Sequence, residues 1–144
     1  MALTAEKKAK IVNRLRPVGV WMIGTLLVQI LVGTATALWL EIPNNPNNYG
    51  SYTNILWLNA HLWVGTALSV FATWLPIDAI RVKNKQWTWV SLVGLFAIIS
   101  AFGGGSAFLA SAGKNDVQSF VMAVSCVVAL AVYLVPFLRK PAAN

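Results

Sequence analysis

Four long apolar runs separated by short polar segments set the pattern of the chain. The runs occupy about residues 17–40, 55–77, 87–109 and 117–138. Each has the length of about 20 residues that an α-helix needs to cross the roughly 30 Å hydrocarbon core of a bilayer. The runs lack the polar–apolar alternation of barrel strands. The pattern therefore predicts an all-α membrane protein, built as a bundle of four transmembrane helices.

The polar segments complete the predicted domain organisation. Residues 1–16 carry five basic residues and one acidic residue, with a weak apolar stripe, which is typical of a segment held at an anionic membrane surface. Residues 17–138 form the predicted transmembrane domain, and residues 139–144 form a short cytoplasmic tail. The first apolar run is too long for a signal peptide, and no small-residue cleavage site follows it.

The distribution of basic residues predicts an orientation. Of the eleven lysines and arginines, five precede the first run, three lie between the second and third runs, and two follow the fourth. Only Lys114 lies on the other side. The positive-inside rule then places both termini and residues 78–86 in the cytoplasm of a multi-pass cell-membrane protein, with residues 41–54 and 110–116 outside. Tryptophans near the predicted run ends would form an aromatic belt: Trp39, Trp57, Trp74, Trp87 and Trp89.

The composition agrees with a membrane protein. Hydrophobic residues make up 58% of the chain and charged residues 10%, whereas soluble domains are about 25% charged. The net charge of +7 raises the question of nucleic acid, but the basic residues flank apolar runs and no nucleic-acid motif is present. We therefore predict lipid headgroups, and no nucleic acid, as the anionic partner. The single cysteine, Cys126, excludes an intrachain disulfide and is expected to be a small core residue.

His61 is the only histidine and lies about six residues, or roughly 9 Å, into the second run. A polar side chain at that depth normally faces the bundle interior or a watery cavity. We favour a histidine that is hydrogen-bonded inside the bundle. A haem, quinone or metal site completed by a partner, and a proton-relay or ligand-contact role, stay open. One histidine falls short of an ordinary zinc or copper site, so no metal site is predicted.

A run of small residues, Gly103, Gly104, Gly105 and Ser106, interrupts the third apolar run. Each glycine costs a helix about 1 kcal/mol relative to alanine. We expect compensation through close helix packing, with a break that forms a lipid or cofactor pocket as the alternative. Antiparallel threading puts this run at the depth of His61, and we predict that both face one region together with residues 41–54.

Other small and polar residues also predict close helix packing. Small residues recur at a spacing of four, which lets helix backbones approach, and Gln29 near the middle of the first run is expected to hydrogen-bond between helices. The small residues are Gly33 with Ala37, Gly65 with Ser69, and Ala97 with Ala101 and Gly105.

No chemical signature of an enzyme or an ion-coupled transporter stands out. Asp78, Asp116 and Glu41 lie at predicted run ends, where water is expected, and no carboxylate lies within a run. Coupled transporters usually need such a carboxylate. No nucleophile–base pair or phosphate-cradling loop is present.

Several short motifs resemble those of a group of small, uncharacterised prokaryotic four-helix membrane proteins. Over residues 24–135, the group's pattern is an Ile-Pro loop, a His-x-x-x-Gly element, a Gly-x-Ser-x-Phe-Leu stretch and a Met-Ala element. The matching residues are Ile42, Pro43, Pro46 and Tyr49; His61 and Gly65; Gly103, Gly105, Ser106, Ala107, Phe108 and Leu109; and Asp116, Ser119, Met122 and Ala123.

The resemblance also carries an expectation about ligands. Group members often have a further histidine in the first loop, where this chain has Asn45 before Pro46. The resemblance implies that any haem or metal site involving that histidine is lost here. In size and basic ends, the chain is also similar to accessory subunits of membrane oxidoreductases, including copper membrane monooxygenases.

Three functional hypotheses follow from the sequence. The leading one is a non-catalytic accessory subunit of a larger integral-membrane complex of energy metabolism, with bound lipids. The second is a haem- or quinone-binding electron-transfer module that uses His61. The third is a small transporter or channel subunit, for which Gln29, His61 and scattered hydroxyl residues are the only polar path.

Overall fold

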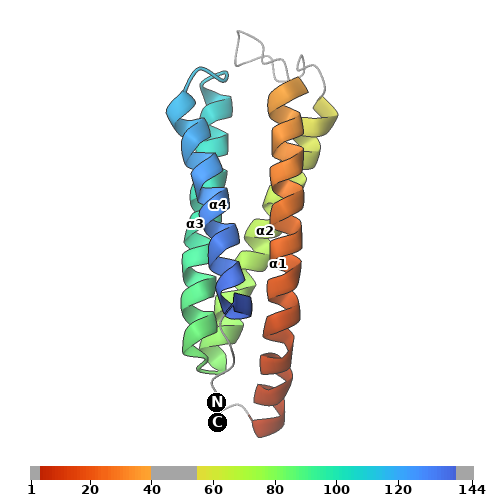
Figure 1. The fold of residues 1–144 in the computed structure, drawn as a ribbon, viewed down its shortest axis with the longest axis vertical. Helices are drawn as coiled ribbons and strands as arrows, with labels where there is room; N and C mark the ends of the chain where they lie inside the picture. Colours follow the sequence, from red (N-terminus) through yellow and green to blue (C-terminus); the bar gives the residue numbers. More distant parts are fainter. Residues whose placement is uncertain (1–3, 40–54, 139–144) are drawn as a thin grey trace.

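The computed structural model of the chain describes residues 4–39 and 55–138. This part of the chain consists of helices and short turns: α1 (Ala5–Trp39), α2 (Ile55–Arg81), α3 (Lys85–Ala110) and α4 (Asp116–Leu138). Figure 1 shows the helices running up and down the long axis of the molecule. The prediction of an all-α, four-helix protein is confirmed.

All four helices are long and apolar enough to cross a membrane. Little of that apolar surface is covered inside the molecule, because at most 33% of the most apolar 18-residue window of any helix is buried, and only 11% in α4. Large apolar side chains such as Trp21, Leu31 and Phe96 are at least 70% exposed. A surface of this kind is compatible with hydrocarbon and would be costly in water.

The first helix joins two segments that the sequence analysis treats separately. α1 runs from Ala5 through Pro17 to Trp39 without interruption, so residues 5–16 are the first turns of the same helix as the first apolar run. The predicted 41–54 loop, with its motif residues and Asn45, and the predicted 139–144 tail lie outside the described residues.

Two short turns connect α2 to α3 and α3 to α4. Each contains a left-handed residue two positions after the helix end, Lys83 (φ 59°) or Ala112 (φ 53°). The next backbone N–H, of Asn84 or Gly113, donates to a carbonyl five residues earlier, at 3.1 and 3.0 Å. This is the hydrogen-bond pattern of a Schellman helix end. The side chain of Asn84 then caps α3 by accepting from the N–H of Trp87.

The core lies at one end of the bundle. We define the basic end as the end where α1 begins and α2 turns into α3, and the distal end as the opposite one. Figure 1 shows the α1–α2 pair diverging from the α3–α4 pair toward the distal end. The core residues therefore come from the basic-end and middle turns of the four helices: Leu15, Met22, Leu26, Leu68, Ala72, Leu75, Ala79, Trp87, Val90, Ala97, Ile98, Ala129 and Tyr133.

Two sequence expectations about the core have different outcomes. Cys126 packs against the core from a half-buried position, as expected for a small core residue. Trp87, expected at a membrane surface, is instead buried, and its ring meets Phe137 edge-on with centroids 6.2 Å apart. The approach of α1 explains this burial, because Gly19 leaves room for the indole ring.

Candidate functional site

Gln29 of α1 and His61 of α2 form a polar contact between the two helices. The side-chain amide nitrogen of Gln29 donates to the backbone carbonyl of His61 over 3.1 Å. The same nitrogen lies 3.3 Å from Nε2 of His61. This second contact is a hydrogen bond to the ring only in the tautomer whose Nε2 carries no proton.

Two glycines make this polar contact possible. A Cβ at Gly33 of α1 would lie 2.8 Å from Cε1 of His61, and a Cβ at Gly65 of α2 would lie 3.1 Å from the Gln29 amide nitrogen. Gln29 and Gly33 are four residues apart, as are His61 and Gly65. Each polar side chain therefore lies over a glycine of the opposite helix, in a reciprocal arrangement that lets α1 and α2 approach closely.

The Gln29–His61 contact leaves two polar atoms without a partner. Among the described residues, Oε1 of Gln29 and Nδ1 of His61 are buried and make no hydrogen bond. An axial haem ligand must present an open ring nitrogen, but here Nε2 faces the Gln29 amide and Nδ1 is covered beside Gly33. The contact geometry thus favours an interhelical polar contact over haem ligation at His61.

The glycine run in α3 packs against α4 and does not break the helix. A Cβ at Gly104 would lie 3.0 Å from the backbone oxygen of Gln118 and 3.1 Å from the backbone nitrogen of Met122. A Cβ at Gly105 would lie 3.1 Å from the sulfur of Met122. α3 is continuous through this segment. The predicted close packing is therefore present, and the alternative of a helix break is wrong.

The structure does not bring His61 and the glycine run together as we predicted. His61 contacts α1, whereas Gly104 and Gly105 contact α4. Sequence position sets the depth of a residue along its helix but leaves open which neighbouring helix it faces. The two groups lie toward the same end of the molecule and belong to different helix pairs.

The remaining predicted packing residues divide into two kinds. Ala97 is buried and Ala101 is half-buried in α3. Gly103 and Ser106 lie on the exposed face of α3, and a Cβ at Gly103 would meet no heavy atom within 4 Å. Gly24 of α1 also faces open space. Gly103 and Gly24 therefore have no packing role among the described residues.

Sequence reasoning missed a glycine–aromatic contact between α3 and α4. Tyr133 is fully buried, and its Cε2 and Cζ atoms lie 2.6 Å from where a Gly94 Cβ would be. The Tyr133 hydroxyl has no hydrogen-bond partner within the described part of the chain. The signal available in the sequence is a glycine flanked by bulky residues, Val93 and Leu95, which does not identify its partner.

Sequence reasoning also missed an ion pair at the basic end. The Arg14 guanidinium contacts the Asp78 carboxylate, joining α1 to α2. The Asp78 side chain is only 6% exposed, whereas that of Arg14 is 54% exposed. The expectation that water surrounds Asp78 is therefore wrong: the approach of α1 covers the carboxylate, and Arg14 provides its counter-charge.

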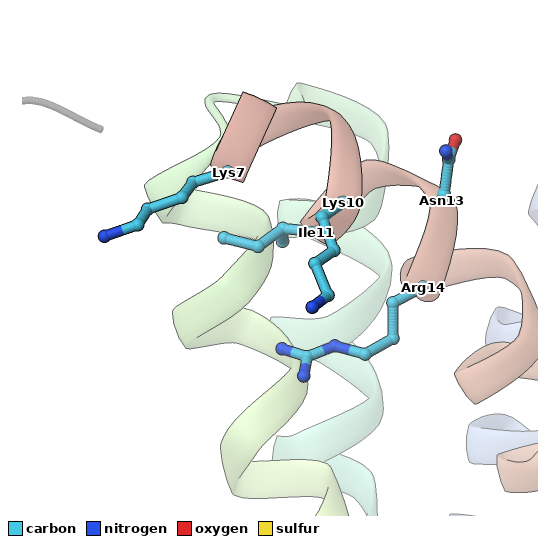
Figure 2. Close-up of a pocket in the computed structure, with 5 residues that line it drawn as sticks. All are labelled: Lys7, Lys10, Ile11, Asn13 and Arg14. Carbon is cyan, nitrogen blue, oxygen red and sulfur yellow. The ribbon is translucent and has the colours of Figure 1, made fainter. Parts of the chain in front are cut away.

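Two shallow hollows on the surface of the basic end combine basic and apolar side chains. The larger has a volume of about 440 Å³ and is lined by Lys7, Lys10, Ile11, Asn13 and Arg14, shown in Figure 2. The smaller has a volume of about 250 Å³ and is lined by Ile80, Lys83, Lys85, Thr88 and Trp89.

Metal ligands do not cluster in residues 4–39 and 55–138. No group of three or more histidine, cysteine or carboxylate side chains there could hold a metal ion. Comparisons of the chain with protein-family models, with curated protein sequences and with solved structures find no match.

Proposed function

We propose that the chain is a non-catalytic structural subunit of a larger integral-membrane complex. In this proposal, the four helices cross the cell membrane, and the basic end, with both termini, lies in the cytoplasm. Support comes from four helices of spanning length with exposed apolar faces. Further support comes from Arg14, Arg16, Arg81, Lys83 and Lys85, which gather at one end of the bundle, whereas Lys114 lies at the other.

One observation carries the proposed role as a subunit: Gly103 has no packing partner within the described chain. Of the eight glycines in the described helices, six have a neighbouring heavy atom within 4 Å of the position that a Cβ would take, and Gly24 and Gly103 have none. A glycine within a helix costs about 1 kcal/mol relative to alanine. Gly104 and Gly105 offset that cost by close contact with α4, whereas nothing in the described chain offsets it at Gly103, where we infer a helix of another chain.

The surroundings of Gly103 fit a partner helix. Ile99, Gly103, Ser106 and Ala110 are all exposed, and spacings of three and four residues place them along one face of α3. Three of these four side chains are small, so a second helix could approach the α3 backbone closely there. The Gly103 face, defined by these four residues, is the proposed contact with the larger complex.

The proposed orientation predicts opposite accessibility of the two turns. In a Cys126→Ala background, a cysteine at Lys83 and a cysteine at Lys114 should react with a membrane-impermeant maleimide from opposite sides. In intact cells the Lys114 position should be labelled and the Lys83 position should not, until the membrane is permeabilised. Labelling of both positions in intact cells would contradict four membrane crossings.

The proposed subunit role predicts that Gly103→Leu disrupts assembly without unfolding the chain. Leucine is a better helix former than glycine and meets open space here, so the isolated protein should be at least as stable as wild type. Its bulk would separate the partner helix, and the apparent dissociation constant of assembly should rise at least about tenfold, or about 1.4 kcal/mol. On native electrophoresis, less of the variant than of the wild type should comigrate with a larger complex.

Ala67→Leu provides a matched control because Ala67 is another exposed small residue, on α2. This variant should comigrate with the complex as wild type does. Subunits of membrane oxidoreductases are the first partners to seek by mass spectrometry, given the similarity in size and basic ends. Migration of the wild-type chain as a lone monomer after gentle solubilisation would refute the subunit role.

A further inference from the structure

We propose that the larger hollow at the basic end binds the phosphate of an acidic phospholipid. The hollow is lined by Lys7, Lys10 and Arg14, with Ile11 between them. This proposal rests on the membrane placement proposed above, but it does not depend on a partner subunit. Its ligand is a lipid with a net negative headgroup, such as phosphatidylglycerol, held by charge and by contact of its glycerol and acyl region with apolar side chains.

The helical register of α1 places the three cations together. At 100° per residue, Lys7, Lys10, Ile11 and Arg14 fall within about 100° of one another around the helix. Figure 2 shows Lys7, Lys10 and Arg14 extending from successive turns of α1, with Asn13 pointing away from them. Glu6, the acidic residue of the first turn, falls roughly 100° from Lys7 but only about 40° from Lys10, four residues further along the helix. Glu6 therefore borders the Lys10 side of this face, but it is not among the side chains that line the hollow.

Asp78 holds one of the cations of the hollow, the Arg14 guanidinium, in place. The Asp78 carboxylate is almost fully buried on α2, and it holds the Arg14 guanidinium from one side. A guanidinium has five N–H donors, and the arginine side chain is still 54% exposed. Donors that Asp78 does not use are thus available on the open side, where Lys10 also reaches. Since the ion pair itself is neutral, Lys7 and Lys10 supply the net positive charge of the hollow.

The hollow lies at the depth expected for lipid phosphates. Arg14 comes three residues before the start of the first apolar run, or roughly 4.5 Å along the helix, and Lys10 lies about one further turn out. Long basic side chains at such positions direct their charges to the headgroup layer while their stems contact apolar surface. Ile11 is half-buried within this face, so the hollow offers apolar contact beside its cations. A lipid fits this combination better than a soluble anion does.

Binding of phosphatidylglycerol to the purified full chain tests the proposal. Apparent dissociation constants can be measured in detergent by native mass spectrometry, with phosphatidylcholine as the zwitterionic reference. Each lysine near a headgroup contributes a factor of about fivefold, so Lys10→Gln should weaken phosphatidylglycerol binding about fivefold and Lys7→Gln with Lys10→Gln roughly 30-fold. Phosphatidylcholine binding should change by less than about twofold.

Lys114→Gln is the matched control, because it removes the same charge at the distal end. This variant should bind phosphatidylglycerol as wild type does, and equal weakening by Lys114→Gln and Lys10→Gln would overturn the site. Unchanged binding by the double variant would overturn it as well. Helical circular dichroism verifies folding, and neither lysine belongs to the buried ion pair, so the scaffold should stay intact.

A separate measurement distinguishes the lipid from a soluble anion. Inorganic phosphate at millimolar concentration should leave phosphatidylglycerol binding unchanged. Displacement of the lipid by phosphate, with the same dependence on Lys7 and Lys10, would show that the acyl chains contribute nothing, and would overturn the lipid assignment. All of these measurements use the isolated chain, so their failure is distinguishable from failure of the Gly103 assembly experiment.

Discussion

Replacing Gly94 with valine is expected to destabilise the isolated protein by about 3 kcal/mol, as severe overpacking of a core does. A Cβ at this position would lie 2.6 Å from Cε2 and Cζ of Tyr133 and 2.7 Å from its hydroxyl oxygen. Tyr133 is 0% exposed, so the ring cannot move aside into solvent without a rearrangement of its neighbours. Either the α3 and α4 backbones separate, or the tyrosine leaves the core. The free energy of unfolding in detergent, from denaturant titration followed by circular dichroism, gives the measurement.

Two further variants identify the cause of this loss. Gly24→Val makes the same substitution where a Cβ meets no atom within 4 Å, and it should leave the stability of the isolated chain nearly unchanged. Tyr133→Leu removes the distal ring atoms that a Cβ at Gly94 would meet. In this background, Gly94→Ala should lower the free energy of unfolding by at least about 1 kcal/mol less than it does in the wild type, because the two residues are in contact and their effects are coupled. Additive effects of the Gly94 and Tyr133 substitutions would refute the contact as the origin of the loss.

Replacing Arg14 with glutamine is expected to cost the isolated protein about 3 kcal/mol, at the lower end of the range for breaking a buried ion pair. The Asp78 carboxylate is buried by the approach of α1, and without Arg14 it would lie there without a counter-charge. The value is at the lower end because the arginine is half exposed, which weakens the pair by solvent screening. Unfolding in detergent measures the change.

The two partners of this ion pair should respond unequally. Asp78→Asn leaves a neutral amide in the buried position, and the freed Arg14 can turn toward water, so this change should cost only about 1 kcal/mol. The double variant Arg14→Gln with Asp78→Asn should be more stable than Arg14→Gln alone, because the uncompensated charge is gone. Equal single losses that simply add in the double variant would show that the pair has no stabilising role.

The structure distinguishes residues of the same type that the sequence cannot separate. Gly103, Gly104 and Gly105 are consecutive, and composition cannot separate them. In the structure, Gly104 lies against the backbone of α4, Gly105 against a methionine sulfur, and Gly103 against nothing in the described chain. A turn of 100° per residue is enough to produce these three environments. The candidate interface at Gly103 therefore emerges only from the packed helices.

The candidate residues Gln29 and His61 show the same division. Each is predictable as a polar group in an apolar helix that must face the interior. Their mutual contact is not predictable, because it depends on the rotation of α1 and α2 and on the openings left by Gly33 and Gly65. From the sequence, Asp78 is expected to be exposed to water at the end of an apolar run. Only the structure shows that α1 packs beside it and covers its carboxylate.

By itself the sequence determined the number of helices, their apolar character and their approximate bounds, except for the start of α1, which lies at Ala5 and not at residue 17. These properties depend on runs of hydrophobic residues and on turn chemistry, which act locally along the chain. Only the tertiary structure decided which face of each helix is covered, which glycines have neighbours and which carboxylate is buried. Those outcomes depend on helix rotation and on the approach of distant segments, and hydrophobicity that extends around the whole circumference of a helix carries little information about either.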